Sequence, residues 1–474
     1  MIKDGQNIFR LFKTSFVYIA ATVISRFITF ALLPVFTNFL TAEEFGIFSL
    51  IIAFISFVAV LVPVGTDSAL LNYYIKFPEQ KKSYFSVAYF MTLFNLLLFS
   101  LLFFLLRKFI MRFVIPDENF FTVFLVLLLV VIEVLNIFPR LIFRAENKAI
   151  LFFLVSVIHS IFMFTLCYLF VAKSNMGVRG IILGFLLSDV TVFIFTLPSI
   201  FKNIHFRIPI EVVKKIITFS FPFAVSAVFG MLLEVSDRFI LKFFSDLKAV
   251  GLYSAGYRVG SLMNILVIGF NLAWYPYFLN IINKEDAKRR LSNTVTIVIT
   301  VFLYLWFLIY LWIADFLKIR VFGVYLMGGD YWPAISIIPI IALGYIFLLF
   351  YNLQIPGIFQ LEKTKYVPIA YGVATTINII LNIILIPILG YSGAAISTCI
   401  SYFVLSFVIY IVNNKIYPMQ YQWSKITLNV FFIGLMILFV SFYKSITIKV
   451  LITVFVSVLH CFYIRRVLSI KRQN

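Results

Sequence analysis

The stretch that decides the fold is residues 216–277, IITFSFPFAVSAVFGMLLEVSDRFILKFFSDLKAVGLYSAGYRVGSLMNILVIGFNLAWYPY. Two apolar runs, each long enough to cross a bilayer, are joined here by a short polar turn. Four charged residues lie inside the runs: Glu234, Asp237, Arg238 and Arg258. An ion at the centre of a membrane helix costs at least about 2.5–3.5 kcal/mol, so such residues usually face a cavity or a partner. The stretch therefore predicts a membrane transporter with charged side chains that face the interior of the helix bundle.

The composition of the whole chain agrees with a lipid environment. Of its 474 residues, 63% are hydrophobic and 12% are charged, and a soluble protein could not bury that much apolar surface. The formal net charge of +20 is expected from basic cytoplasmic loops, so we expect no nucleic-acid partner. Cys167, Cys399 and Cys461 lie in apolar runs and are interpreted as packing residues rather than disulfides or metal ligands.

Fourteen runs are long and apolar enough to be spans. The first, Ser15–Phe39, lacks the features of a cleavable signal peptide and is expected to remain as a span. The last two are separated only by a tight turn at Lys444. Lys and Arg gather in the loops on the side of the N-terminus, which predicts that both termini are cytoplasmic. The runs lie at residues 15–39, 46–74, 84–106, 119–139, 149–172, 179–201, 216–241, 250–277, 292–314, 332–353, 365–388, 391–413, 426–443 and 447–465.

The chain also contains an internal repeat. At an offset of 205 residues, Val23 matches Val228, Phe39 matches Phe244 and Gly46 matches Gly251, with further matches in order along the chain. Six spans fill one copy, so both copies enter the membrane from the same side and form parallel repeats. The sequence thus predicts an all-α integral membrane protein with about fourteen transmembrane helices. We expect an N-lobe at residues 1–213, a C-lobe at 214–414, and two further helices with a short basic cytoplasmic tail at 415–474.

Several motifs resemble one family of transporters. SDRFIL (236–241), VGLYSAGY (250–257), NLAWYPYF (271–278), VGTDSALLNYY (64–74) and LNIILIPILGYSGAAIST (381–398) are similar to patterns of polysaccharide-type flippases, as is the loop at 144–148. These flippases belong to the multidrug/oligosaccharidyl-lipid/polysaccharide exporter superfamily. The resemblance covers spans 1–12 and implies a V-shaped pair of lobes around a cavity that opens to either side in turn. It also implies a cargo, an undecaprenyl-diphosphate-linked oligosaccharide for O antigen, capsule or a related glycan.

Two arginines are candidates for binding the cargo. A diphosphate crossing a bilayer needs cations near the middle of the membrane, and the planar guanidinium binds phosphate with two parallel hydrogen bonds. Arg26 lies near mid-depth in span 1, and Arg258 lies in the outer half of span 8. In the lipid II flippases of the superfamily, arginines on these two spans are thought to hold the head group, which the resemblance extends to Arg26 and Arg258. The alternative is that each pairs with an acid or reaches the membrane surface.

Other charged residues are candidates for gating. Glu234 lies one turn before Arg238, where the two charges would neutralise each other, and Asp237 is adjacent. We interpret these three residues as a structural ion pair or gate. Asp67 follows Pro63 and Gly65, which can break the helix. Asp67 is either a latch between the lobes or a cap that accepts backbone hydrogen bonds.

Three further residues are candidates for ion coupling. His159 in span 5 and Asp189 in span 6 lie at one depth, so neighbouring helices could bring them together as a proton- or cation-coupling pair. A hydrogen-bonded packing pair is the alternative. Glu133 in span 4 is a carboxylate with the same two interpretations.

The main hypothesis is a flippase that acts by alternating access in the bacterial cytoplasmic membrane. Its partners would be the polyprenyl-diphosphate-linked glycan, membrane lipids and a coupling cation, H⁺ or Na⁺, and one chain would suffice for function. The sequence has no phosphate-binding GxxxxGK[ST] loop and no metal-spaced His/Cys cluster, so we expect neither an enzyme nor a cofactor. The alternatives are a multidrug or toxic-cation antiporter of the same superfamily and a lipid II flippase.

Overall fold

The computed structural model describes residues 17–114, 120–206, 208–282, 284–361, 363–419, 421–442 and 445–469, with the side chains of 111 and 461–469 left out. The first helix is Val17–Phe39, whose last part is α2 (Leu32–Phe39). The other elements follow it in chain order: α3(Ala42–Leu61), α4(Thr66–Lys76), η1(Pro78–Gln80), α5(Lys81–Leu105), α6(Arg107–Val114), α7(Phe120–Ala145), α8(Ala149–Cys167), η2(Tyr168–Lys173), α9(Gly177–Asn203), α10(Ile210–Phe244), α11(Leu247–Gly260), α12(Leu262–Ile281), α13(Ala287–Leu317), β1(Arg320–Val321), β2(Val324–Tyr325), η3(Gly329–Ile337), α14(Ile338–Gln360), α15(Tyr366–Leu389), α16(Tyr391–Ile416), α17(Trp423–Phe442) and α18(Ile446–Ser469).

The expected spans are present as helices. Within the described residues, 13 helices are long and apolar enough to cross a membrane, and α18 adds a shorter apolar stretch, Ile446–His460. The chain is therefore an all-α, multi-pass membrane protein. The turn expected at Lys444 lies outside the described residues, as do residues 1–16 and the end of the basic tail.

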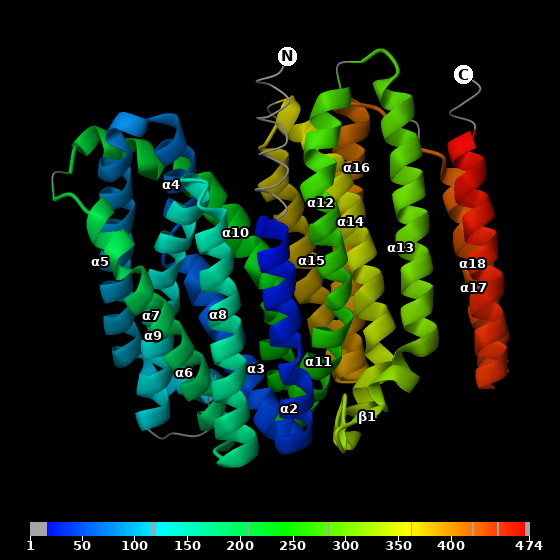
Figure 1. The fold of residues 1–474 in the computed structure, drawn as a ribbon, viewed down its shortest axis with the longest axis horizontal. Helices are drawn as coiled ribbons and strands as arrows, with labels where there is room; N and C mark the ends of the chain where they lie inside the picture. The colour runs from blue at the N-terminus through cyan, green and yellow to red at the C-terminus, as the bar shows by residue number, and fades with distance from the viewer. Residues whose placement is uncertain are drawn as a thin grey trace.

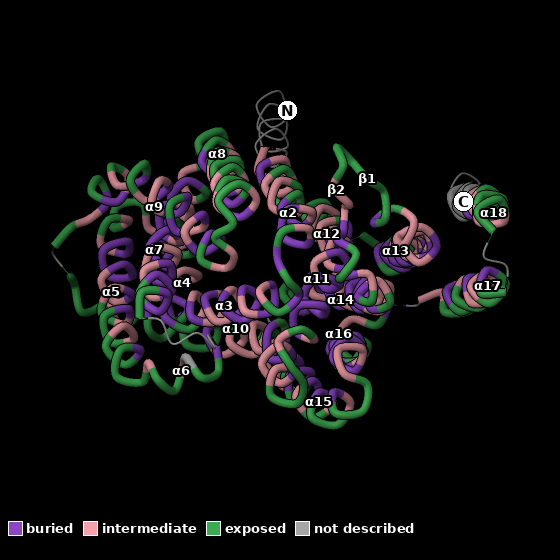
Figure 2. Tube along the Cα trace, turned by 90° about the horizontal axis from the view of Figure 1, so that it is seen from below, coloured by how far each residue is buried: buried purple, intermediate pink, exposed green. Residues whose placement is uncertain are grey.

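The helices form two lobes that lie side by side (Figure 1). Helices α3–α9 make the N-lobe and α11–α16 make the C-lobe, while α17 and α18 stand at the far edge of the C-lobe (Figure 2). The long helix α10 slants between the lobes and packs on both α3 and α15. In Figure 1 the first described helix runs downward from its start, and α18 runs upward to the end of the described chain.

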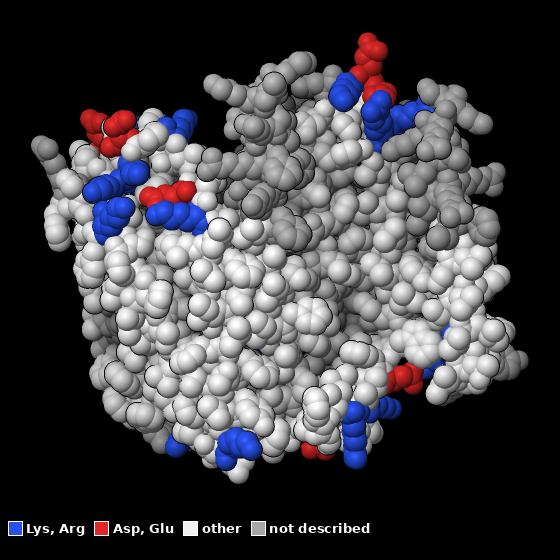
Figure 3. All heavy atoms as spheres, viewed as in Figure 1, with Lys and Arg blue, Asp and Glu red and all other residues white. Residues whose placement is uncertain are grey.

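The charged side chains follow the same layout. Figure 3 shows Lys, Arg, Asp and Glu mainly near the upper and lower rims of one face, with a broad uncharged band between them. Such a band is expected where lipid chains cover a protein, because exposed charges are costly there. The band therefore agrees with a membrane that surrounds the helices at mid-height.

The predicted second span is broken near its middle. Val62–Gly65 separate α3 from α4, and Gly65 adopts a left-handed φ of 74°. A Cβ atom at Gly65 would lie 2.5 Å from the carbonyl oxygen of Ser220 on α10. The break that Pro63 and Gly65 suggested is confirmed, and it lets α4 approach α10 closely.

The connection between α13 and α14 contains a small hairpin, β1–β2, that the sequence did not predict. It is followed by η3, and together they reach across to the N-lobe at the lower end of Figure 1. Asn38 donates a hydrogen bond to the carbonyl of Tyr325 (2.8 Å), and the Gly328 amide donates to the hydroxyl of Thr37 (3.0 Å). Tyr331 donates to the carbonyl of Thr41 (2.8 Å). The hairpin thus ties the end of the first helix to the C-lobe.

Candidate functional site

A cavity of ≈ 670 Å³ lies between the two lobes. Its walls come from the first helix and from α3, α7, α9, α10 and α11. Four of its lining residues are charged: Glu133, Glu234, Arg238 and Arg258. All four belong to the candidates that the sequence indicated. A cavity with charged walls inside a membrane protein is where polar cargo is expected.

Arg258 crosses the boundary between the lobes. Its Nη2 atom donates a hydrogen bond to the backbone carbonyl of Thr29 on the first helix, at 2.5 Å. The guanidinium also lies 5.6 Å from the centre of the Phe36 ring, a cation–π distance. Arg258 has no carboxylate partner within the described residues. Its charge is therefore available to an anion in the cavity.

Arg26 lies in a different environment. It is exposed and lines a small apolar pocket against α12, next to Ile265, Ile268 and Gly269. It is not among the residues that line the central cavity, although its charge acts on the Glu234 carboxylate. The structure therefore places Arg258 in the cavity and Arg26 beside it.

The prediction that Arg238 forms an ion pair with Glu234 is wrong, because the partner of Arg238 is Asp237. Arg238 Nη1 lies 3.2 Å from Asp237 Oδ1, and the same atom donates to the backbone carbonyl of Glu234 at 2.7 Å. The Asp237 carboxylate is fully buried, which favours it as the counter-ion, whereas the Glu234 carboxylate faces the cavity. Within the described residues no hydrogen bond or ion pair to the Glu234 carboxylate is found.

Aromatic hydroxyls complete this network, and the sequence analysis missed them. Tyr253 donates a short hydrogen bond to Asp237 Oδ2, and Thr398 on α16 donates to the same oxygen at 3.4 Å. The Arg238 guanidinium stacks over the Tyr257 ring, 4.6 Å from its centre. Tyr345 donates to the hydroxyl of Tyr257 at 3.0 Å. The available signal was the spacing of Tyr253 and Tyr257, which places both on one face of α11.

The structure brings His159 and Asp189 together. His159 Nε2 on α8 lies 2.9 Å from Asp189 Oδ1 on α9. Glu133 on α7 lines the central cavity, and its charge interacts with that of Asp189. The three coupling candidates therefore lie near one another where α7, α8 and α9 pack together, and their function stays a prediction.

Asp67 does not act as a latch in this conformation. It lies in the first turn of α4, where a carboxylate interacts favourably with the positive end of the helix. No partner for it in the C-lobe is found in the part of the chain that the structure describes. A latch role in another conformation remains a prediction.

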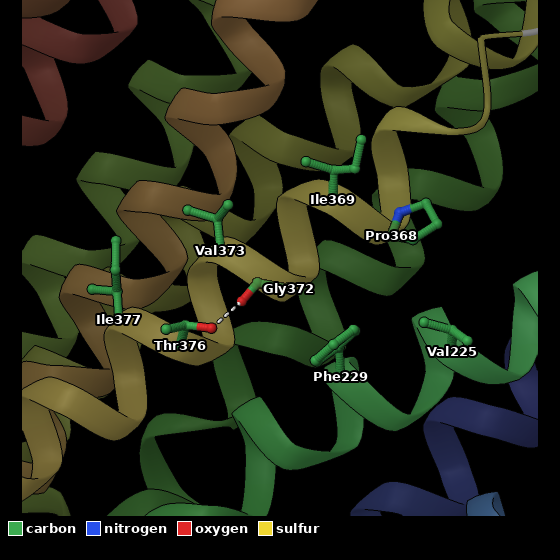
Figure 4. A pocket seen from close by; sticks show the side chains of 8 residues that line it. All are labelled: Val225, Phe229, Pro368, Ile369, Gly372, Val373, Thr376 and Ile377. Atoms are coloured by element: carbon green, nitrogen blue, oxygen red, sulfur yellow. Dashed lines mark hydrogen bonds between the residues drawn. The ribbon is translucent and has the colours of Figure 1, made fainter.

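Two apolar pockets lie outside the central cavity. One, of ≈ 610 Å³, lies between α10 and α15 and is lined by apolar residues that include Val225, Phe229, Ile369 and Val373 (Figure 4). The other, of ≈ 390 Å³, lies between α13, α14 and α17 and is lined by apolar side chains that include Trp306. Neither pocket has a charged lining residue, so neither suits a phosphate group.

The charged lining of the cavity suits the binding of ions. Within the described residues there is no group of three or more His, Cys, Asp or Glu that could hold a metal ion. Cys167 and Cys399 are buried and free. The cavity offers a guanidinium for an anion and two carboxylates, from Glu133 and Glu234, for a cation or proton.

Comparisons with known proteins identify the family and the fold. A family model described as "Polysaccharide biosynthesis protein" matches residues 11–282. The fold is similar to a structure of the lipid II flippase MurJ in an inward closed conformation, with a TM-score of 0.76 and 18% identity over 96% of this chain and 99% of that chain. It is also similar to an inward-facing multidrug resistance MATE family transporter, with a TM-score of 0.61 and 16% identity over 85% and 95% of the two chains.

A Vibrio cholerae MATE transporter, VcmN, in a mutant form, has a TM-score of 0.59 and 13% identity over 88% of this chain and 98% of its own. At these identities the similarity shows the fold alone. Among curated protein sequences, no match to this chain was found. The fold is thus that of MurJ and the MATE transporters.

Proposed function

Since this chain belongs to the polysaccharide biosynthesis protein family, we propose that it is a flippase for a polyprenyl-diphosphate-linked oligosaccharide. The cargo would be an undecaprenyl-diphosphate-linked unit of O antigen, capsule or a related polysaccharide. Alternating access of the central cavity would carry its head group from the cytoplasmic to the outer leaflet. The proposed location is the bacterial cytoplasmic membrane, with both termini in the cytoplasm and one chain sufficient for transport.

The observation that carries this proposal is the free guanidinium of Arg258 in the central cavity. Arg238 is neutralised by Asp237, whereas Arg258 bonds only to the Thr29 carbonyl in the described part of the chain. A diphosphate would offer charged oxygens in place of that carbonyl, and charge-assisted hydrogen bonds are about twice as strong as neutral ones. Cargo binding would therefore release Arg258 from Thr29 and loosen one link between the lobes.

The apolar tail of the cargo needs a separate surface. The pocket between α13, α14 and α17 is lined by Trp306, Phe347 and Trp423, among other apolar residues. A polyprenyl chain would bury its apolar surface there while the head group occupies the cavity. This gives α17, which lies outside the repeat, a function in lipid binding.

Coupling to a cation gradient would supply the driving force. Glu133, His159 and Asp189 are the proposed coupling residues, with H⁺ or Na⁺ as the ion. Glu133 supports this proposal because it lines the cavity and its charge interacts with that of Asp189.

Two other candidates have specific support. Glu234 presents to the cavity a carboxylate without a partner among the described residues, which suits the cationic cargo of a multidrug or toxic-cation antiporter, and the MATE transporters share the fold. The lipid II flippase MurJ also shares the fold, so lipid II is an alternative cargo. Binding of tetraphenylphosphonium that Glu234→Gln removes would favour the antiporter.

The alternating-access proposal can be tested by fixing the lobes together. Asn38→Cys and Tyr325→Cys place one thiol on each side of the hydrogen bond between the first helix and the hairpin. These changes would be made in a chain whose native cysteines at 167, 399 and 461 are replaced by serine. A reducible bismaleimide would join the two thiols, and each single-cysteine variant serves as the matched control.

Transport of a fluorescent undecaprenyl-diphosphate-linked N-acetylglucosamine in proteoliposomes is the measurement. We expect cross-linking to stop transport in the double variant only, and reduction of the linker to restore it. Transport that continues in the cross-linked protein would contradict alternating access at this contact.

A further inference from the structure

Five polar side chains meet inside the N-lobe, where α7, α8 and α9 pack together. They are Glu133, Asn136 and Arg140 on α7, His159 on α8 and Asp189 on α9. Spacings of three and four residues place the first three on one face of α7. Asn136 is 0% exposed and Asp189 is 3% exposed. Polar groups buried this deeply in a membrane helix bundle are expensive and usually functional.

The Asp189 carboxylate is the centre of the cluster. Its Oδ1 atom lies 2.9 Å from His159 Nε2 and 3.9 Å from Arg140 Nη2. The amide of Asn136 donates to the backbone carbonyl of Asp189 at 3.0 Å, which fixes α7 against α9. Glu133 lies on the same face of α7 as Asn136 and Arg140, and its charge interacts with the Asp189 carboxylate. Two neighbouring carboxylates repel each other, which favours a bound proton.

Several buried atoms of the cluster have no hydrogen-bond partner within the described residues. They are Asn136 Oδ1, Arg140 Nε and Nη2, His159 Nε2 and Asp189 Oδ1. The ion-pair distances at Asp189 therefore do not have hydrogen-bond geometry. Unpaired polar atoms gathered at one buried point indicate that the cluster binds something small and polar.

We propose that this cluster is the coupling-ion site, that its ion is a proton, and that Arg140 sets this selectivity. The proposal rests on the proposed transport function. With His159 neutral, the two carboxylates and the Arg140 guanidinium leave one negative charge in the membrane. One bound proton, shared among His159, Asp189 and Glu133, makes the cluster neutral.

Sodium fits this site poorly. Hard cations such as Ca²⁺ and Mg²⁺ take oxygen ligands, and the same preference is expected of Na⁺. Here the Asp189 oxygen already faces an imidazole nitrogen and a guanidinium. The Arg140 charge would repel a metal ion beside Asp189, whereas a proton needs no ligand shell.

The proton has a route to water through Glu133, which lines the central cavity. The charges that act on Glu133 come from all three helices: Arg140, His159 and Asp189. Of the other helices packed on α7, α3 presents only uncharged residues to the cavity. The charged residues of α4 and α5 lie toward the predicted cytoplasmic side; they are Asp67, Lys76, Lys81 and Lys82. Glu234, Arg238 and Arg258 line the opposite wall of the cavity.

The test uses the full chain in proteoliposomes on a solid-supported membrane, without cargo. Currents are recorded after a pH step and after a sodium step at constant pH. Asp189→Asn defines the part of each current that belongs to the cluster. We expect the pH-evoked current of the wild type to be lost in Asp189→Asn. Any sodium-evoked current should be the same in the wild type and in Asp189→Asn.

The selectivity claim is tested with Arg140. Arg140→Gln should add a sodium-evoked current, because the repelling charge is gone. Arg140→Lys keeps the charge and should behave like the wild type, as should the control Arg144→Gln one turn further along α7. A purely structural role for Arg140 would not create a new sodium response.

Two results would overturn the proposal: a wild-type sodium current that Asp189→Asn removes, or the absence of any Asp189-dependent pH current. An Arg140→Gln protein with unchanged selectivity would overturn the role of Arg140. Binding of undecaprenyl diphosphate, measured by native mass spectrometry, shows that each variant is folded. If the wild type does not bind undecaprenyl diphosphate, the result contradicts the proposed flippase function, whereas the proposed proton site is still supported by an Asp189-dependent pH current.

Discussion

Gly46 and Gly251 contact each other backbone to backbone where the first turns of α3 and α11 cross. A Cβ at Gly46 would lie 2.1 Å from the Leu247 carbonyl oxygen, and a Cβ at Gly251 would lie 1.8 Å from that of Ala42. Ala42 and Leu247 are separated by the same 205 residues as the two glycines. The contact is thus reciprocal, as expected where a two-fold axis relates two copies of one repeat.

This glycine contact is expected to hold the predicted outer side closed. Gly251→Ala adds a methyl group that has no space, so α3 and α11 must separate at their first turns. The outer side of the cavity should then open more often. Labelling of Ser49→Cys, which lines the cavity, by an impermeant maleimide added outside should become several-fold faster.

Gly434→Ala is the control, because a Cβ there would meet no atom within 4 Å. It should leave the labelling rate of Ser49→Cys unchanged. Equal rates in the Gly251→Ala and Gly434→Ala proteins would show that the contact does not limit outer opening.

Removing the hydroxyl of Tyr253 should destabilise the C-lobe. Tyr253→Phe deletes the hydrogen bond to the buried Asp237 carboxylate and leaves that oxygen with Thr398 alone. A lost hydrogen bond to a buried charged group costs about 1–3 kcal/mol. Unfolding by titration with SDS should therefore need less denaturant, whereas Tyr275→Phe on α12, at an exposed position, should match the wild type. A wild-type midpoint for Tyr253→Phe would contradict this account of the network.

The loop between α7 and α8 should become less stable in acid. Burial opposes ionisation of Glu146, but the Lys148 ammonium at 2.6 Å and the Tyr74 hydroxyl outweigh it and lower the pKa of Glu146 from its usual 4.5. A carboxylate with a lowered folded-state pKa stabilises the protein above its unfolded value and loses this contribution as the pH falls.

The melting temperature of the wild type should therefore fall below about pH 4.5, and the melting temperature of Glu146→Gln should be lower at pH 7 and fall less on acidification. Glu79→Gln, in η1 at an exposed position, is the control. Parallel pH profiles for wild type and Glu146→Gln would rule out this contribution.

Much of the fold follows from sequence patterns that have a simple physical cause. Span-length apolar runs, loop charges and the 205-residue offset predict the helices, and Gly46 and Gly251 prove to be equivalent positions in direct contact. The shared depth of His159 and Asp189 also predicts their meeting, because neighbouring helices place equal depths side by side.

Other features depend on side-chain directions that helical spacing does not determine. Arg238 could reach Glu234 or Asp237, and only the burial of Asp237 against Tyr253 decides between them. The position of Arg140 beside Asp189 depends on how α7, α8 and α9 pack together, which the sequence pattern does not determine. The hairpin between α13 and α14 lies in a connection without a strong periodic pattern.

The central claim is that Arg258 binds the diphosphate of the cargo. The most direct measurement is binding of undecaprenyl diphosphate to the purified protein by native mass spectrometry. Wild type would be compared with Arg258→Ala, Arg26→Ala and the control Arg320→Ala, which lies exposed on the β1–β2 hairpin. We predict binding at least about tenfold weaker in Arg258→Ala, since losing a charge-assisted hydrogen bond costs about 1.5–3 kcal/mol, a smaller loss in Arg26→Ala and none in Arg320→Ala. Unchanged binding in Arg258→Ala would contradict the account.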